Sequence, residues 1–341
     1  MRKPSKAAHT SNIAITGTSG FLGSTLLKNL DSNPRFRNIL AIDRKQPPFK
    51  LKKAKWVSFD LIEGDADQKL AALFEKYKTK TVVHAALLTQ PIRNLEEAHE
   101  VQSVGTMHLL NAAAAAPVHK LILASTTDVY GAFPDNPNFL TEEHLARGTL
   151  LSPFLKDKVE VEEQFLKFQK KHPTKVVTVL RPATILGPTV NNFKTHFFQN
   201  PLVPTAMGFD PLVQFVHESD VIRAFIKVLE KDHPGIFNVV AEGVIPLSRV
   251  IHILGKMPVP IPTVFLYPAA DFLWYANIGV VPAEHIHFLK YLCIADGTKA
   301  WHKLKFKPVH TTLETLHSFN GRGLDKKEIT RRLEEIEDAT A

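Results

Sequence analysis

The chain has a single cysteine, Cys293, among its 341 residues, so it cannot form an internal disulfide. It also lacks any run of 18 apolar residues, which argues against a transmembrane segment. Residues 1–11 are polar and basic, without the apolar core of a signal peptide, and we expect them to form a tail. Together these absences predict a protein of a reducing compartment, the cytoplasm.

Several other patterns are also missing. The histidines show no metal-ligand spacing, so the sequence predicts no metal site, and no internal repeat is visible. Nothing resembles a base-reading motif, so nucleic acid is not an expected partner. The chain is instead 44% hydrophobic and 22% charged, which is typical of a globular protein with one large domain or two closely packed ones. Its net charge of +8 is either solvated surface or an attraction for phosphate-bearing ligands.

The most informative pattern is a glycine-rich turn near the N-terminus. An apolar run at 12–16 predicts a buried strand, and Gly17, Gly20 and Gly23 follow with the spacing G-x-x-G-x-x-G. Gly17 allows the positive φ of a tight turn, Gly20 lets a pyrophosphate approach the backbone, and Gly23 lets the next helix pack on the strand. The N–H groups at the helix start would then face the anion.

Asp43 ends the second apolar run, about 20 residues after the last glycine, where a carboxylate can accept hydrogen bonds from the adenosine ribose. This position favours NAD, because the 2′-phosphate of NADP would meet the negative charge. Arg44 and Lys45 follow directly and could hold that phosphate, so NADP stays open as an alternative. Asp60 could accept a hydrogen bond from the adenine amino group, or it could simply form a turn.

Further motifs lie at the ends of predicted strands, where open α/β sheets bind ligands. With the glycine turn they resemble the extended short-chain dehydrogenases/reductases, in the NAD-dependent epimerase/dehydratase family of sugar-nucleotide enzymes. The likeness spans roughly residues 12–320. The other segments that carry it are Asp60–Leu61, His84–Ala86, Gly105–Thr106, Ser125–Gly131, Arg181–Pro182, Gly187–Pro188 and Phe215–His217 with Asp220.

The resemblance implies an α/β fold, with a doubly wound parallel (Rossmann) sheet of about seven strands and a smaller, discontinuous C-terminal substrate domain. The expected parts are a tail at 1–11, a dinucleotide-binding domain at 12–188 with a return segment at about 213–241, a substrate domain at 189–212 and 242–320, and a charged tail at 321–341. The expected cofactor-binding residues are Gly17, Thr18, Ser19, Gly20, Phe21, Leu22, Gly23, Asp43, Arg44, Asp60, Leu61, Ala85, Ala86, Ser125, Lys158, Arg181 and Ala183.

The catalytic set that the resemblance implies is present only in part. Thr126 occupies the position of the hydroxyl that polarises the substrate oxygen. The family uses Tyr-x-x-x-Lys, in which the tyrosine transfers a proton and the lysine lowers its pKa. Here the lysine is Lys158, but the tyrosine position holds Phe154. Phenylalanine has no ionisable group, so the usual proton relay cannot run, and general acid–base assistance of about 10²–10⁴ in rate is lost.

Two explanations stay open for Phe154. Tyr130, Thr126 acting through water, or an unidentified carboxylate could transfer the proton, although the Val-Tyr-Gly stretch around Tyr130 is more often structural. Alternatively, the chain binds a dinucleotide without turnover and serves as a sensor or scaffold. Two further positions depart from the family. Gln102 replaces an asparagine, and Val213 replaces an arginine for a nucleotide-sugar diphosphate, which weakens that substrate assignment.

Residues 257–292 are unusually apolar and punctuated by proline. They could form core or a homodimer contact, receive a lipid-like substrate, or touch a membrane surface. The sequence therefore predicts a small-molecule substrate, either a nucleotide sugar or a lipid-like alcohol or ketone, with NAD or NADP as the cofactor.

Overall fold

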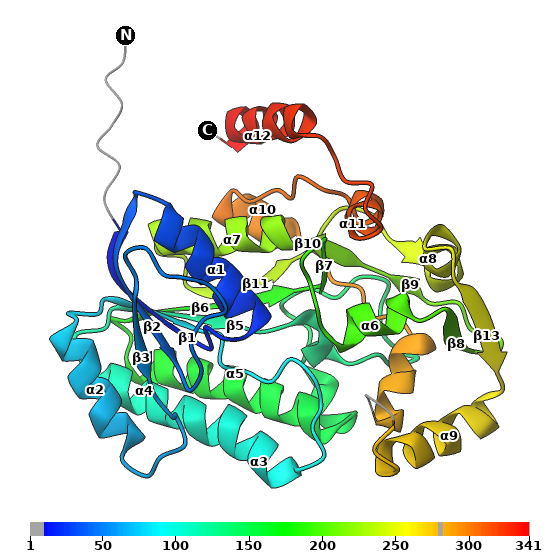
Figure 1. Cartoon of the computed structure of the whole chain (residues 1–341), viewed down its shortest axis with the longest axis horizontal. Helices are drawn as coiled ribbons and strands as arrows, with labels where there is room; N and C mark the ends of the chain where they lie inside the picture. Colours follow the sequence, from blue (N-terminus) through cyan, green and yellow to red (C-terminus); the bar gives the residue numbers. More distant parts are fainter. Residues whose placement is uncertain (1–9, 279–281, 341) are drawn as a thin grey trace.

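The computed structural model describes residues 10–278 and 282–340. Its centre is a seven-stranded sheet in the order β11-β6-β5-β4-β1-β2-β3, in which all neighbouring strands are parallel (Figure 1). This doubly wound α/β sheet confirms the predicted fold class. Its strands are β1 (Thr10–Thr16), β2 (Phe36–Asp43), β3 (Lys55–Ser58), β4 (Thr81–His84), β5 (Lys120–Ala124), β6 (Val176–Pro182) and β11 (Gly235–Val239).

The strand order reverses next to β1. The chain runs from β1 through β2 to β3 at one edge, and then continues at β4 on the other side of β1. Gly17 donates its N–H to Ile42 O, and Ala85 donates to Thr16 O, so the ends of these three strands are joined directly. Open α/β sheets bind ligands at such a reversal, and the glycine turn lies there.

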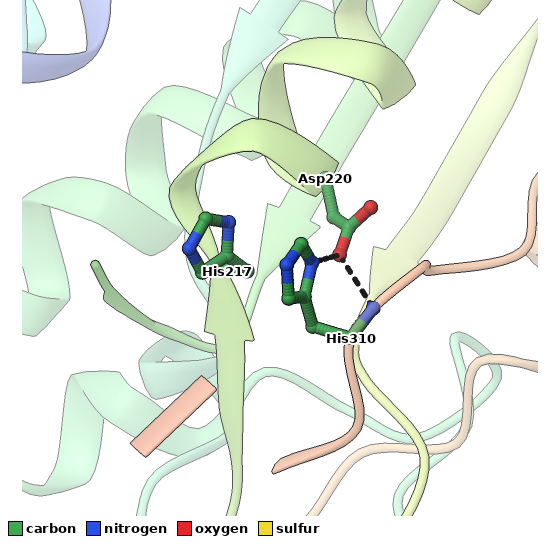
Figure 2. Close-up of side chains that lie close together, drawn as sticks. All are labelled: His217, Asp220 and His310. Carbon is green, nitrogen blue, oxygen red and sulfur yellow. Dashed lines mark hydrogen bonds and ion pairs between the residues drawn. The ribbon is translucent and has the colours of Figure 1, made fainter. Parts of the chain in front are cut away.

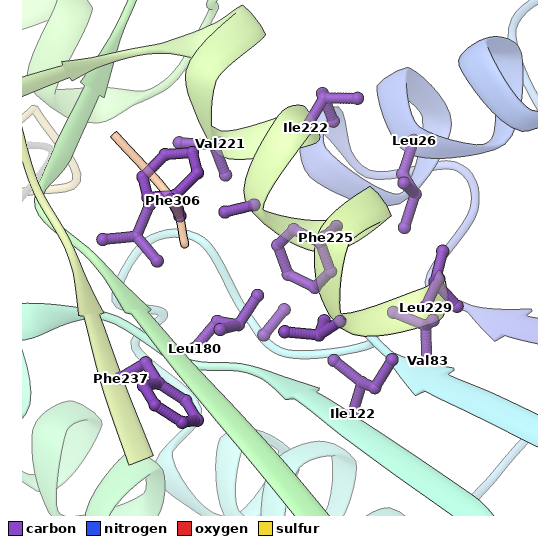
Figure 3. Packing of buried hydrophobic residues seen from close by; sticks show 14 of the residues in the cluster. Leu26, Val83, Ile122, Leu180, Val221, Ile222, Phe225, Leu229, Phe237 and Phe306 are labelled. Carbon is purple, nitrogen blue, oxygen red and sulfur yellow. The ribbon is translucent and has the colours of Figure 1, made fainter. Parts of the chain in front are cut away.

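Helices cover both faces of the sheet (Figure 1). α1 and α7 pack on one face, where Leu26, Ile122 and Phe225 belong to one buried cluster (Figure 3). α2, α4 and α5 cover the other face, around Phe74 and Phe165. The ranges of these helices are α1 (Phe21–Ser32), α2 (Ala66–Lys76), α4 (Gly105–Ala115), α5 (Pro153–Lys171) and α7 (Glu218–Glu230).

The sequence predicts one long helix over 94–116, and the structure divides it. α3 (Leu95–His99) passes into a π-helical turn at Glu100–Val104, which leads into α4. Gln102 is buried in this turn, and its Nε2 donates to Asp157 Oδ2 at 3.4 Å. A π-helical turn accommodates one extra residue, and helix-forming residues on both sides give no sequence signal for it.

The second half of the chain adds three two-stranded sheets and further helices around the carboxyl ends of the main sheet (Figure 1). The paired strands are β7 (Thr184–Leu186) with β10 (Phe215–His217), β8 (Leu202–Ala206) with β13 (Met257–Ile261), and β9 (Leu212–Val213) with β12 (Ile245–Pro246). The α-helices are α6 (Phe193–Gln199), α8 (Leu247–Ile253), α9 (Thr263–Tyr275), α10 (Thr298–Leu304), α11 (Thr312–Phe319) and α12 (Lys326–Thr340). The 3-10 helices are η2 (Thr127–Tyr130), η3 (Arg147–Leu150) and η4 (Ala283–Leu289).

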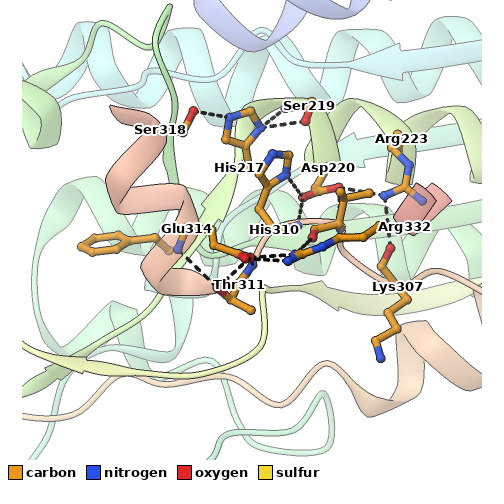
Figure 4. Close-up of polar contacts among 12 residues, drawn as sticks. His217, Ser219, Asp220, Arg223, Lys307, His310, Thr311, Glu314, Ser318 and Arg332 are labelled. Carbon is orange, nitrogen blue, oxygen red and sulfur yellow. Dashed lines mark hydrogen bonds and ion pairs between the residues drawn. The ribbon is translucent and has the colours of Figure 1, made fainter. Parts of the chain in front are cut away.

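The predicted division into a dinucleotide-binding part and a substrate part stays a prediction. Most of the predicted tail at 1–11 lies outside the described residues, and β1 already begins at Thr10. In the predicted C-terminal tail, Arg332 of α12 pairs with Glu314 of α11 at 2.7 Å and donates to Val309 O (Figure 4). Among the described residues, no helix combines the length and the apolar character needed to cross a membrane.

Asp220, near the start of α7, binds the segment around residues 309–310 through hydrogen bonds. Its carboxylate accepts hydrogen bonds from the backbone N–H groups of Val309 and His310 and from His310 Nδ1, and it pairs with Arg223 at 2.7 Å (Figures 2 and 4). Burial alone would raise the pKa of Asp220, but the hydrogen bonds from His310 and Val309 outweigh it and lower that pKa. The carboxylate is therefore charged and held by donors far away in the sequence.

His217, Asp220 and His310 also form a cluster of three groups that could hold a metal ion. The His217 ring stacks on His310 with 3.9 Å between the ring centroids. Burial lowers the pKa of His217 to about 4, and its nitrogens bond the hydroxyls of Ser219 and Ser318. The three side chains already have hydrogen-bond partners within the protein. We therefore interpret the cluster as a structural contact between α7 and the chain around His310.

Candidate functional site

The glycine turn between β1 and α1 is shaped by two close backbone contacts. Gly17 has φ +74°, and a Cβ there would lie 2.4 Å from Ala85 O, so only glycine fits between β1 and the segment after β4. A Cβ on Gly23 would lie 2.1 Å from Gly17 O. These contacts explain why the turn is tight and why α1 begins so close to the strand.

Gly20 differs from its two neighbours. Its φ is −73°, and the nearest atom to an added Cβ would be Gly17 O at 3.4 Å, so the backbone itself does not require glycine there. It caps α1 without a side-chain hydrogen bond, and the N–H groups of the first turn are thus available to an anion. Next to it, Thr18 is fully buried, and its hydroxyl has no hydrogen-bond partner in the described part of the chain. The space above Gly20 and the unpartnered Thr18 hydroxyl are both suited to binding a pyrophosphate.

Asp43 is held beside this turn. Its Oδ2 accepts hydrogen bonds from Ser19 N at 2.8 Å and Ser19 Oγ at 2.9 Å. Arg44 points to Asp60, with 3.6 Å between Arg44 Nε and Asp60 Oδ2 in a partly exposed pair. The structure therefore brings Asp43 to the glycine turn, as a ribose-binding role requires, and gives Arg44 a carboxylate partner that competes with a 2′-phosphate. Asp60 also accepts from Ile62 N, as a turn residue does.

The remaining residues predicted to contact the cofactor divide into two groups. Phe21 and Leu22 open α1, and Ala85 and Ala86 lie against Gly17. Leu61 and Ala183 make contacts away from the glycine turn. Leu61 O hydrogen-bonds to His108 Nδ1, and the buried Ala183 donates its N–H to Val239 O.

Ser125 and Arg181 lie in the interior instead of at the glycine turn. Both contact Glu162 of α5: Ser125 Oγ donates to its carboxylate, and Arg181 Nε bonds it at 3.0 Å. Burial would lower the pKa of Arg181, but the Glu162 charge raises it above its usual value. All three side chains are buried, so their arrangement is explained by the packing of α5 on β6.

Tyr130 and Thr126 have local structural partners. The Tyr130 ring is fully buried, its hydroxyl donates to Asn238 Oδ1 at 2.9 Å, and burial raises its pKa. This favours the structural interpretation of the Val-Tyr-Gly stretch. The Thr126 hydroxyl accepts from Asp128 N at 3.2 Å as the cap of η2. Thr126 lies just after β5, and its contact with a substrate oxygen stays a prediction.

Phe154 and Lys158 lie on one face of α5, as their spacing predicts. Phe154 packs with Leu155 in a small apolar cluster, and Lys158 Nζ lies 4.7 Å from the centre of its ring. The Nζ of Lys158 donates to Leu88 O at 2.7 Å, which gives this buried cation a protein partner. Burial lowers the pKa of Lys158 to about 8, so the side chain is mainly the ammonium at neutral pH and loses its proton as the pH rises through 8.

A cavity of about 460 Å³ opens beside η2, between the end of the main sheet and the second half of the chain. Its lining is mostly aliphatic and aromatic, and it includes Val213, at the position where the family has an arginine. Among the described residues, two charged side chains line it, Asp128 and Lys194, and they pair with each other at 2.6 Å. The surface of the cavity is therefore apolar apart from the Asp128–Lys194 ion pair, whose charges cancel.

His285 lines this cavity from η4, and no sequence motif indicates it. Its Nδ1 is buried without a hydrogen-bond partner in the described residues, and its ring centroid lies 6.0 Å from that of Phe154. Burial lowers its pKa to about 4, so the imidazole is neutral at ordinary pH. Only the fold brings this residue to Phe154, because 130 positions separate them and no motif contains it.

The doubly wound sheet, the glycine turn and the adjacent aspartate define a Rossmann-type dinucleotide-binding protein. Residues 13–240 match the model of the NAD dependent epimerase/dehydratase family, and the chain belongs to that family. This confirms the predicted resemblance, and with it NAD as the family's cofactor.

Three similar proteins illustrate the range of the family. An uncharacterized protein of Mycobacterium tuberculosis is 31% identical over 321 residues, which is 92% of this chain and 84% of its own length. The dTDP-D-glucose 4,6-dehydratase of Mus musculus is 27% identical over 253 residues, 67% of each chain. The structure of MoeE5 in complex with UDP-glucuronic acid and NAD is 22% identical, covers 94% of this chain and 99% of MoeE5, and superimposes with a TM-score of 0.71. It shows a shared fold.

Gly20→Val is expected to abolish NAD binding while leaving the fold intact. The new side chain would occupy the space over the turn, and each charge-assisted hydrogen bond lost to the pyrophosphate is worth about 1.5–3 kcal/mol. Calorimetric titration with NAD measures the effect. Gly64→Val is the matched control, because a Cβ at Gly64 meets nothing within 4 Å. Equal NAD affinities of Gly20→Val and wild type would exclude the turn as the cofactor site.

Proposed function

We propose that this chain is an NAD-dependent oxidoreductase whose substrate is an alcohol or ketone with a large apolar portion. The observation that carries the proposal is the apolar cavity beside η2. Family membership supplies the NAD dependence, and the geometry of the glycine turn supports the place where the dinucleotide binds. When bound, NAD accepts a hydride from a carbinol carbon or returns one to a carbonyl carbon.

The cofactor would be held by the glycine turn and by Asp43. The N–H groups at the start of α1 would meet the pyrophosphate, and the Asp43 carboxylate would accept hydrogen bonds from the adenosine ribose. A tighter affinity for NAD than for NADP follows, because the 2′-phosphate would be repelled by Asp43.

Several groups that can transfer a proton line the cavity, Tyr291 among them, although the Phe154 position itself carries no phenol. Asp128 and His285 both line the cavity, and Thr126 lies just before Asp128 at the end of β5. A neutral imidazole with a free nitrogen can accept a hydrogen bond from a substrate hydroxyl. We expect slow turnover in the wild type, because no group occupies the position of the family's tyrosine hydroxyl.

The charges of the cavity favour an apolar substrate over a nucleotide sugar. A diphosphate requires cationic partners, but Lys194 is already paired with Asp128 and also donates to Thr184 Oγ1. Val213 offers no charge at all. Burying a diphosphate among aliphatic and aromatic side chains without cations would be costly, whereas a hydrocarbon chain gains from the same surroundings.

A nucleotide sugar remains the second candidate, favoured by the relatives. The mouse protein is named for a dTDP-sugar reaction, and MoeE5 was solved with UDP-glucuronic acid. A diphosphate would have to separate Lys194 from Asp128 or recruit His196, which also lines the cavity.

The test is a panel of secondary alkanols, UDP-glucose and dTDP-glucose, assayed with NAD and with NADP by nicotinamide absorbance. Mass spectrometry of the small molecules released on denaturation supplies an independent readout. We expect turnover of alkanols, increasing with chain length, and NAD as the preferred cofactor. Turnover of the nucleotide sugars alone would establish the second candidate. Retained NAD without turnover of any substrate would instead identify a non-catalytic dinucleotide sensor.

A further inference from the structure

Helix α9 presents an extensive apolar surface to solvent. Five of its residues or close neighbours are between 66% and 81% exposed: Val264, Phe265, Phe272, Tyr275 and Ile278. The helix contains a single charged residue, Asp271. An exposed apolar surface of this kind marks a place of contact with a partner or a membrane.

The same helix forms one wall of the cavity. Leu266, Ala269 and Ala270 line it from the inner side of α9. Leu273, which is 40% exposed, and Ile278, which is 70% exposed, belong to both the cavity lining and the outer surface. The apolar lining therefore reaches the surface of the molecule at α9.

Cationic side chains lie beside the aromatic residues of this helix. The Arg93 guanidinium lies 4.4 Å from the Trp274 ring centre and donates to Trp274 O at 2.9 Å. Lys290 Nζ lies 5.5 Å from the Tyr267 ring centre, nearer the start of the helix. An apolar face with aromatic rings and flanking Arg and Lys is the pattern of a helix at a bilayer interface, where the cations meet lipid headgroups.

We propose that α9 docks the protein on a lipid bilayer, with its exposed face in the interfacial region and the cavity opening toward the lipid. Thirteen residues of helix span only about 20 Å, less than a bilayer core, so α9 lies in the plane of the interface. An apolar substrate would then pass from the membrane into the cavity without crossing water.

A lipid surface fits the cavity rim better than a second copy of the chain. Another copy seated on α9 would also cover Leu273 and Ile278, and thereby close the cavity at its apolar rim. A bilayer covers the same side chains and leaves the opening in contact with lipid. The inference uses the cavity that supports the proposed function, but it does not depend on turnover.

The experiment is co-sedimentation of the full-length protein with phosphatidylcholine vesicles, with and without 30% phosphatidylglycerol, at roughly 0.1 M salt. The variant is Phe265→Ser/Phe272→Ser, whose exposed side chains contribute little to the folded core. The matched control is Leu145→Ser/Leu150→Ser, which removes two side chains that are 81% and 75% exposed outside α9. Sedimentation velocity without vesicles measures the oligomeric state in parallel.

We expect wild type and control to bind vesicles, more tightly with the anionic lipid, and the α9 variant to lose at least tenfold in affinity. Absence of binding by wild type to either vesicle would overturn the proposal. So would a wild-type dimer that the α9 variant alone converts to monomer, because α9 would then face a second copy. Vesicle binding requires neither NAD nor substrate, so a failed turnover assay and a failed docking assay are separate results.

Discussion

Arg181→Met is expected to lower the free energy of unfolding by about 3–5 kcal/mol, the usual cost of removing one partner from a buried ion pair. Arg181 and Glu162 each expose only 3% of their surface. The substitution would leave the Glu162 carboxylate buried, with Ser125 as its remaining hydrogen-bond donor. Urea unfolding followed by circular dichroism measures the change.

Two further variants distinguish the buried charge from the loss of packing. Arg181→Met/Glu162→Leu removes both charges and should recover most of the lost stability, since apolar replacement of a whole buried pair is often neutral. Lys167→Met breaks an exposed pair with Glu163 on the same helix and should cost less than about 1 kcal/mol. A loss in Arg181→Met as small as that in Lys167→Met would refute the structural role assigned to the buried pair.

Phe154→Tyr is expected to raise the rate of hydride exchange by about 10²–10⁴, the usual contribution of a positioned acid–base group. The structure retains the lysine that this chemistry needs, with Lys158 Nζ 4.7 Å from the centre of the Phe154 ring. A nearby cation favours the phenolate and lowers the pKa of the new phenol. Nicotinamide absorbance with the best alkanol of the panel measures the rate.

The pH dependence of that gain follows from Lys158. Burial lowers its pKa to about 8, so the ammonium is present below that pH and is lost as the pH rises through it. The advantage of Phe154→Tyr should therefore decline above pH 8. Adding Lys158→Met to Phe154→Tyr should remove most of the gain. Equal rates for wild type and Phe154→Tyr across pH 6–9 would show that another group already transfers the proton efficiently.

The sequence was most informative where function depends on short stretches of chain. Gly17, Gly23 and Asp43 lie within one strand–helix–strand unit, and their spacing within that unit predicts the turn that the structure shows. Lys158 was placed on the right helix face because helical periodicity is local. The parallel sheet of about seven strands was implied by the family resemblance, and the apolar runs that form its strands are local patterns as well.

The sequence failed where contacts join distant residues. The pairing of Arg181 with Glu162 depends on α5 packing against β6. No sequence motif contains both residues, so the sequence does not predict that they pair. His285 approaches Phe154 only because the second half of the chain folds over the end of the sheet. The predicted helix at 94–116 is divided by a π-helical turn that holds one extra residue. Helix propensity does not predict where such a turn forms.

The hydrogen bonds of Asp220 have a consequence for synthesis of the protein on the ribosome. Its carboxylate lies on α7, but two of its backbone donors are Val309 and His310, which are translated about 90 residues later. Until those residues emerge, α7 can pack only by burying a charge that lacks these donors, at a cost of several kcal/mol. The nascent sheet should therefore stay open at α7 until residues 309–310 have left the exit tunnel.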